Sequence, residues 1–168
     1  MSTLVVYFSF GGNTKFIAEK IAETVSADIL ELKTSRKYPA EGFRKYIWGG
    51  KSVIFGEKPE LINAPIHLKK YETVIIGTPI WAGSFTPPIK SFISKYEIQG
   101  KRIAFFACHA GGGARKCFAK LKKELSGNEF IGETAFVEPM KNRKEASLEA
   151  AAWAKSLSPA EARRPPFD

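Results

Sequence analysis

Cysteine is scarce in this chain of 168 residues, which has only two, too few for a disulfide framework. The chain also lacks an apolar run near the roughly 20 residues that a membrane-spanning helix needs. Its first residues, MSTLVVYFSFGG, have neither the basic start nor the cleavage site of a signal peptide, and are typical of a buried strand. These absences predict a protein of the reducing cytoplasm that does not insert into a membrane.

Acidic residues are outnumbered, because 26 Lys and Arg stand against 17 Asp and Glu, a net charge of +9. The basic residues are spread over 33–58, 115–123 and 141–144 with acids among them, and no run reaches five like charges. This dispersion favours an ordinary solvated surface and no nucleic-acid partner. A protein partner of so basic a chain should be acidic, and its association should weaken as salt rises.

Short apolar runs alternate with segments of helical periodicity. Five buried strands are predicted at 3–9, 28–33, 72–78, 101–107 and 130–139. Helices are predicted from Thr14, from Pro87 or Pro88 to about 96, over 114–125, from an N-cap at Asn142 to 157, and over part of 42–55. This alternation predicts an α/β fold, a three-layer doubly wound parallel sheet with helices on both faces. We expect a single domain over 1–168, with its core at about 3–157 and a surface tail at 158–168.

Three loops of unusual composition follow predicted strands, at the edge where ligands of such sheets bind. The first, residues 9–14, combines two glycines with a helix N-terminus, whose free N–H groups and dipole suit a phosphate. Neither GxGxxG nor GxxxxGK[ST] is present, so neither NAD nor ATP is favoured. A tight turn with an N-cap is the alternative that needs no ligand.

The segment VVYFSFGGNTKFIAEKI, residues 5–21, resembles the signature of the flavodoxin family. The resemblance extends through 77–92 and covers about 3–157. It implies a five-stranded sheet of order 2-1-3-4-5 and a non-covalently bound FMN, whose phosphate is held by neutral hydroxyls and backbone amides. Phe10 and Gly11 stand where the family often has Thr-Gly, so the cradle has one hydroxyl fewer. The cofactor-binding residues implied in this loop are Ser9, Phe10, Gly11, Gly12, Asn13 and Thr14.

The resemblance places the two other loops around the flavin ring. Trp81 is the candidate for stacking on the ring, although it is also compatible with an ordinary half-buried tryptophan. The ring edge is assigned to Thr78, Pro79, Ile80, Ala82 and Gly83. The opposite wall is assigned to Cys108, His109, Ala110, Gly111, Gly112 and Gly113. No tyrosine occurs within 108–117, where many family members have one, so this face of the flavin is open or partly covered by His109.

The stretch ACHAGGGARKC, residues 107–117, has other interpretations. A cysteine phosphatase needs C-x5-R, but Cys108 and Arg115 are spaced C-x6-R. Cys108, His109 and Cys117 lack metal-ligand spacing and a fourth ligand, so no metal is predicted. A disulfide is not expected in the cytoplasm, and Cys117 is predicted to be a small buried hydrophobe.

Two further groups stand outside these loops. His67 is predicted to lie on the surface. The aromatic and aliphatic residues of GFRKYIWGG are predicted to form the core face of a helix, or else to shield the flavin or a substrate; they are Phe43, Tyr46, Ile47 and Trp48.

The resemblance implies electron transfer through FMN, in which the flavin supplies the chemistry and no protein acid, base or nucleophile is required. No catalytic residue is therefore predicted. Two alternatives stay open: an FMN-dependent NAD(P)H oxidoreductase acting on quinones or similar acceptors, and a flavin-free module that binds a phosphate ligand. The expected partner is a redox protein with an acidic surface or a small-molecule electron acceptor, and the chain is expected to be a monomer or a homodimer.

Overall fold

The computed structural model of this protein describes residues 2–38, 50–51, 53–54 and 56–158. Strands and helices alternate along the chain, as the apolar runs predicted. Their bounds are β1 Thr3–Tyr7, α1 Asn13–Val25, β2 Asp28–Glu31, η1 Leu68–Lys70, β3 Thr73–Pro79, α3 Pro87–Lys95, β4 Arg102–His109, α4 Ala114–Glu124, β5 Glu129–Val137, η2 Pro139–Asn142 and α5 Arg143–Ser156.

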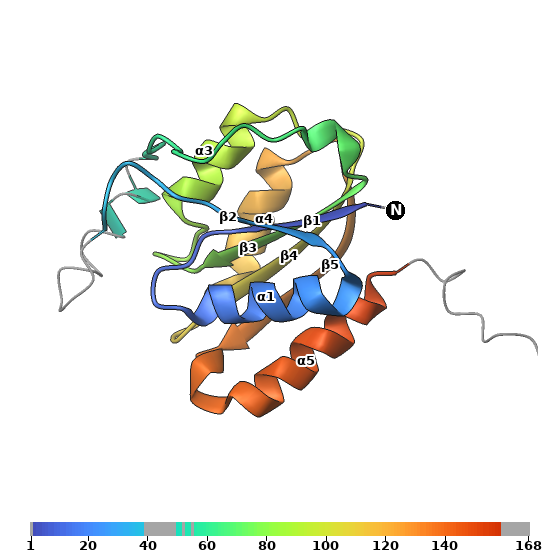
Figure 1. Cartoon of the computed structure of the whole chain (residues 1–168). Helices are drawn as coiled ribbons and strands as arrows, with labels where there is room; N and C mark the ends of the chain where they lie inside the picture. The colour runs from blue at the N-terminus through green and yellow to red at the C-terminus, as the bar shows by residue number, and fades with distance from the viewer. Residues whose placement is uncertain (1, 39–49, 52, 55, 159–168) are drawn as a thin grey trace, which may run out of the picture.

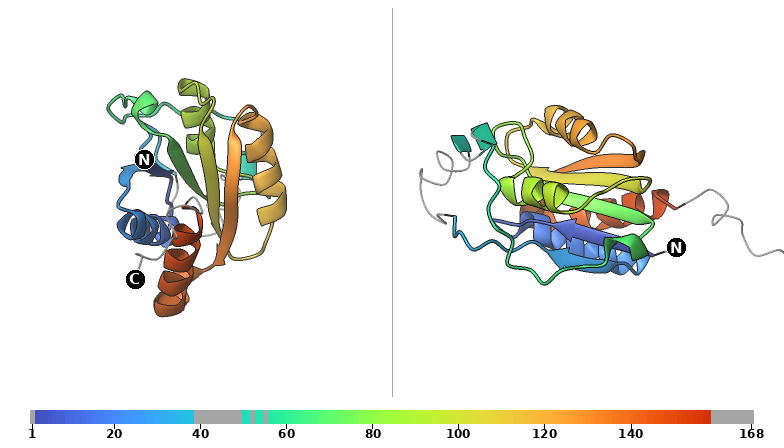
Figure 2. Two further views of the ribbon diagram at one scale, coloured as in Figure 1. Left: turned by 90° about the vertical axis from the view of Figure 1, so that its right-hand side faces the viewer. Right: turned by 90° about the horizontal axis from the view of Figure 1, so that it is seen from above.

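The five strands form one parallel sheet in the order β2-β1-β3-β4-β5. Helices α1 and α5 cover one face of this sheet, and α3 and α4 cover the other (Figures 1 and 2). The predicted three-layer fold and the predicted strand order are therefore confirmed. All strands run in one direction, so the loops after β1, β3 and β4 meet at one edge of the sheet.

Successive residues of the central strands are buried on opposite faces, because side chains alternate along a strand. Val5 and Phe106 lie in the core beneath α1 and α5. Val6 and Phe105 lie in the core beneath α3 and α4. Both cores are apolar, which is why the central strands are continuous hydrophobic runs in the sequence.

Asn142 occupies the N-cap position of α5, but its side chain makes no capping bond to the helix. Its amide donates instead to the carboxylate of Glu145. The predicted N-cap position is therefore confirmed, but the capping hydrogen bond is not made, because the side chain bonds Glu145 instead.

The remaining predictions concern His67, the aromatic stretch and the C-terminal tail. His67 is exposed, as expected. The aromatic stretch from Phe43 to Trp48 and the tail from 159 to 168 lie outside the described residues. Among the helices that the structure describes, none is long and apolar enough to cross a membrane.

Candidate functional site

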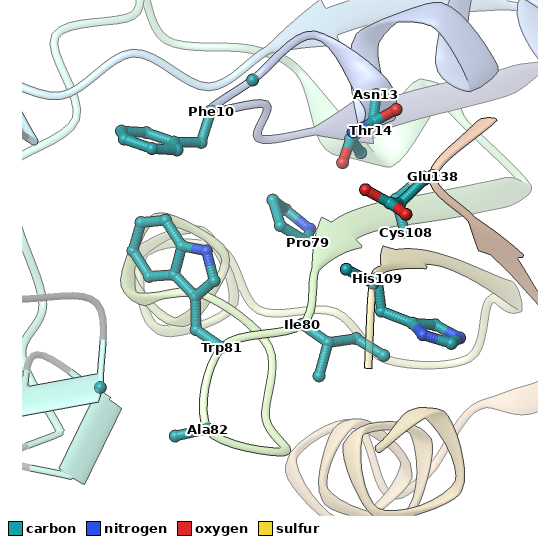
Figure 3. A pocket seen from close by; sticks show the side chains of 13 residues that line it. Phe10, Asn13, Thr14, Pro79, Ile80, Trp81, Ala82, Cys108, His109 and Glu138 are labelled. Carbon is teal, nitrogen blue, oxygen red and sulfur yellow. The ribbon is translucent and has the colours of Figure 1, made fainter. Parts of the chain in front are cut away.

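A cavity of about 300 Å³ opens where the loops after β1, β3 and β4 meet (Figure 3). The residues of the three predicted loops that line it are Phe10, Gly11, Asn13, Thr14, Pro79, Ile80, Trp81, Ala82, Cys108, His109 and Ala110. The other predicted residues of these loops do not line it; they are Ser9, Gly12, Thr78, Gly83, Gly111, Gly112 and Gly113. Aromatic side chains lie at one end of this cavity, and polar side chains lie at the other (Figure 3).

The polar end is built on the N-terminus of α1. Gly12 is its N-cap with φ 90°, a backbone conformation that favours glycine. The Ser9 hydroxyl oxygen accepts a hydrogen bond from the Lys15 backbone N–H at 3.1 Å, so Ser9 closes the loop onto the helix. The first N–H groups of a helix have no carbonyl to bond within it, and the first turn of α1 has no acidic residue. This end of the cavity therefore suits an anion.

Space is kept open around the glycines of the first and third loops. A Cβ atom built on Gly11, Gly12, Gly111 or Gly112 would meet no heavy atom within 4 Å. Packing within the described protein therefore does not require glycine there. At Gly11, which lines the cavity, this open space adjoins the N-terminus of α1, whose free N–H groups suit a phosphate-bearing ligand.

The second loop makes a tight turn from Trp81 to Ser84. The backbone N–H of each of these residues donates to the carbonyl oxygen of the other, both at 2.9 Å. Ala82 and Gly83 between them have φ 49° and 66°, the pattern of a type I′ turn. The buried Thr78 hydroxyl accepts a bond from the Thr86 backbone N–H at 3.1 Å. The side chain of Thr78 therefore fastens the two ends of the loop together.

Ala82 is strained, because an L-residue with a positive φ crowds its own carbonyl. We expect Ala82→Val to lower the free energy of unfolding by about 1–2 kcal/mol, since a β-branched side chain tolerates this conformation least. Ala82→Gly should leave that free energy unchanged or raise it slightly, because relief of strain offsets the greater freedom of the unfolded chain. Denaturant unfolding of both variants checks this, and equal stability of the two contradicts the positive φ.

The indole of Trp81 is fixed edge-on by three other rings. Its centroid lies 5.6 Å from that of Phe10, 5.9 Å from Phe8 and 5.2 Å from Tyr38. The interplanar angles are 71–87°, the edge-to-face geometry that aromatic pairs favour. Trp81 is thus half-buried among aromatic rings and also lines the cavity; its stacking on a flavin stays a prediction.

The third loop is held by its histidine. His109 Nδ1 accepts a bond from the Gly112 backbone N–H at 2.8 Å, which leaves the proton of the neutral ring on Nε2. A Cβ atom on Gly113 would lie 3.2 Å from the Gly83 Cα atom. The second and third loops therefore touch backbone to backbone, and glycine at 113 permits that approach.

Cys108 and Cys117 are free, buried thiols. Burial raises the pKa of each from its ordinary 9.0 to about 12, so both are protonated at neutral pH. A protonated thiol is neither a nucleophile nor a metal ligand. Within the described part of the chain, no group of three or more His, Cys, Asp or Glu side chains could hold a metal ion.

Both thiols are expected to resist iodoacetamide at about pH 8 in the folded protein and to react fully in guanidinium, because only the thiolate reacts. Mass spectrometry before and after unfolding measures this. The raised pKa values also make the free energy of unfolding depend on pH. Above pH 9.0 the thiols of the unfolded chain lose protons that the native thiols keep, so the free energy of unfolding should fall as the pH rises. Rapid alkylation of native Cys108 would contradict the burial.

Glu138 and Gly50 also line the cavity and were not predicted from the sequence. Glu138 follows β5, and its backbone N–H donates to the His109 carbonyl oxygen at 3.0 Å. Two residues later, the Met140 N–H donates to Asn13 Oδ1 at 3.0 Å. The strand-end rule that identified the other loops applies equally to the end of β5 and would have found Glu138, whereas no feature of the sequence indicates Gly50.

Known proteins that are similar to this chain include flavodoxins and flavoproteins. The profile of the family described as Flavodoxin matches residues 2–153. A flavoprotein from Lactobacillus acidophilus NCFM, solved in complex with FMN, is 25% identical with a TM-score of 0.71, over 85% of this chain and 97% of that one.

Two more distant structures share the fold. A flavodoxin from the domain Archaea is 17% identical with a TM-score of 0.57, over 94% of this chain and 99% of that one. The flavodoxin, WrbA-like protein from Agrobacterium tumefaciens is 20% identical with a TM-score of 0.55, over 93% of this chain and 96% of that one. Because the family match spans nearly all of the described residues, this chain belongs to the flavodoxin family.

Proposed function

We propose that this protein carries electrons by means of a non-covalently bound FMN. The observation that supports the proposal is the cavity itself, which places a helix N-terminus free of acidic residues opposite an aromatic wall. FMN has the matching parts, a phosphate at one end and a flat apolar ring system at the other. FMN is also the cofactor of the 25% identical flavoprotein.

The residues of this chain would divide the task of holding the cofactor. Asn13, Thr14 and the backbone N–H groups before them would hold the phosphate with neutral donors. Phe10 and Trp81 would pack against the ring and exclude water from it. Bound FMN supplies the redox chemistry, since it takes up and releases electrons one or two at a time.

Glu138 places a negative charge at the polar end of the cavity, where Lys141 Nζ lies 2.8 Å from its carboxylate oxygen. We expect Glu138→Gln to raise the affinity for FMN about fivefold, because removal of this partly exposed charge relieves roughly 1 kcal/mol of repulsion from the phosphate. The affinity for riboflavin, which lacks the phosphate, should not change. Fluorescence titration of the apoprotein with each flavin measures both constants, and an equal change for the two would contradict this assignment.

The alternative of an FMN-dependent NAD(P)H oxidoreductase is supported by the third loop. Ala110, Gly111 and Gly112 are exposed, and they have no ring with which to cover the flavin. An open face admits a nicotinamide or a quinone, whereas a carrier needs only a route for electrons.

Reduction kinetics separate the two functions. A carrier is reduced rapidly by a ferredoxin reductase and only slowly by NADH or NADPH alone. An oxidoreductase sustains the oxidation of NADH or NADPH when a quinone is supplied. Rapid steady-state turnover with quinone contradicts the carrier assignment, and a colourless protein that ignores added FMN supports the flavin-free module instead.

A further inference from the structure

Three lysines of α4 form a stripe along one side of the helix. Lys116, Lys120 and Lys123 are spaced i, i+4 and i+7, which places them on one face. The buried residues Cys117 and Leu121 lie on the other side and pack into the core. We call Lys116, Lys120 and Lys123 the α4 stripe. The helix that carries it, α4, forms with α3 the layer on one face of the sheet (Figure 2).

The acidic side chains around the stripe are already paired. Glu124 bonds Lys90 at 3.2 Å, and Glu133 bonds Lys122 at 2.6 Å. Glu57, across the hollow described below, bonds Arg36 at 2.7 Å. Within the residues that the structure describes, none of the three stripe lysines forms an ion pair.

At the start of the stripe the charge of α4 is placed against the preference of the helix itself, whereas Lys123 lies in the last turn, where a cation is favoured. Arg115 and Lys116 lie in its first turn, which has no acidic residue. Cations are disfavoured at this end, because the helix dipole is positive there. Residues that destabilise the helix they belong to are expected where a function requires them.

The stripe begins at the rim of the cofactor cavity. A Cβ atom on Gly83 would lie 3.3 Å from the Lys116 side chain, and Gly83 follows Ala82 of the cavity wall. At its other end, Lys120 and Lys123 line a second hollow of about 300 Å³, together with Lys90 of α3 and the carboxylates of Glu57 and Glu124. The stripe therefore extends from the rim of the cavity to a hollow in which three lysines face two carboxylates, and both carboxylates are already paired.

We propose that the α4 stripe is the docking surface for an acidic electron-transfer protein, an inference that rests on the proposed carrier function. Charge complementarity selects the partner, and the contact at Lys116 brings it to the rim of the flavin site. Such a surface acts mainly on the rate of association and on its dependence on salt. The net charge of +9 attracts an acidic partner from any direction, and the stripe fixes the direction of docking.

An acidic blue copper protein serves as the probe. Each transfer takes one electron from the reduced flavin and converts one Cu(II) to Cu(I). Two copper proteins therefore oxidise one fully reduced flavin, whose protons pass to solvent. Stopped-flow absorbance at low salt gives the second-order rate constant for the FMN-loaded protein and for its variants.

The test variant is K116Q/K120Q/K123Q, and the control is K69Q/K144Q/K155Q. The control replaces three exposed lysines of η1 and α5 and has the same net charge. We expect the test variant to lower the rate constant about tenfold and to flatten its salt dependence, and the control to change it by less than about twofold. Reaction with the small anion ferricyanide, which needs no docking surface, should change much less in both variants.

Equal losses in the two variants would overturn the inference, because net charge alone would then explain the rate. Rates unchanged in both would overturn it as well. Failure of the proposed function is seen separately, before mixing, as a protein without the yellow absorbance of bound FMN; the inference then falls with it.

Discussion

The replacement of Gly77 by alanine is expected to lower the free energy of unfolding by about 3 kcal/mol. A Cβ atom at position 77 would lie 2.0 Å from Phe106 Cζ and 2.5 Å from its Cε1. Phe106 is fully buried and pairs with Gly77 across β3 and β4, so its ring has no free space to enter. Denaturant unfolding measures the loss, which corresponds to a fall in Tm of roughly 6–12 °C.

Gly11→Ala is the matched control, because a Cβ atom on Gly11 would meet nothing within 4 Å; it should cost less than about 0.5 kcal/mol. The double variant Gly77→Ala/Phe106→Leu should be more stable than the sum of its single changes predicts, since a smaller side chain makes room for the methyl group. Strict additivity would show that the strain does not come from the Phe106 ring.

The Gly77 contact also supports the site. The Gly77 carbonyl oxygen accepts the backbone N–H of Phe8 at 3.2 Å, immediately before the first loop begins. A shift of β3 at this position therefore moves the base of the cavity.

Thr14→Val is expected to weaken FMN binding about 10–100-fold, because a hydrogen bond to a charged group contributes roughly 1.5–3 kcal/mol. Thr14 is 1% exposed and lines the polar end of the cavity. Valine has nearly the same shape, so the change removes only the hydroxyl, together with its hydrogen bond to the Cys108 thiol. Riboflavin affinity should change less than about threefold, because riboflavin has no phosphate to lose a bond.

Thr24→Val on the same helix is the control. The Thr24 hydroxyl donates to the Lys20 carbonyl oxygen at 2.7 Å, and Thr24 does not line the cavity. The same substitution there should leave the affinity for both flavins unchanged. Equal weakening by both variants would mean that helix stability, and not the cavity hydroxyl, limits binding.

The period of the apolar residues predicted a parallel sheet and the meeting of three loops at one edge, whereas the strand order came from the resemblance to the flavodoxin family. Strand ends were less predictable. Cys108 and His109 continue β4 because they pair with Phe136 and Val137 of β5, a contact between segments far apart in the sequence. Glu138 follows the end of β5, and its backbone N–H bonds the His109 carbonyl oxygen; the strand-end rule identifies its position, and the structure shows this bond.

The sequence also did not predict the directions in which the side chains of the site point. The resemblance assigned Thr78 to the ring edge, but it did not indicate that the Thr78 hydroxyl accepts a bond from the Thr86 backbone N–H. The cluster of Phe8, Phe10, Tyr38 and Trp81 could not be predicted either, because it joins three separate segments. Tyr38 packs edge-on against Phe8 and Trp81, and burial there raises the pKa of its hydroxyl to about 12.

Titration of the apoprotein with FMN and with riboflavin, followed by flavin fluorescence, tests the central claim most directly. A helix N-terminus that holds a phosphate predicts one FMN bound per chain, with riboflavin bound much more weakly. Equal affinity for the two flavins, or no binding of either, would contradict the account.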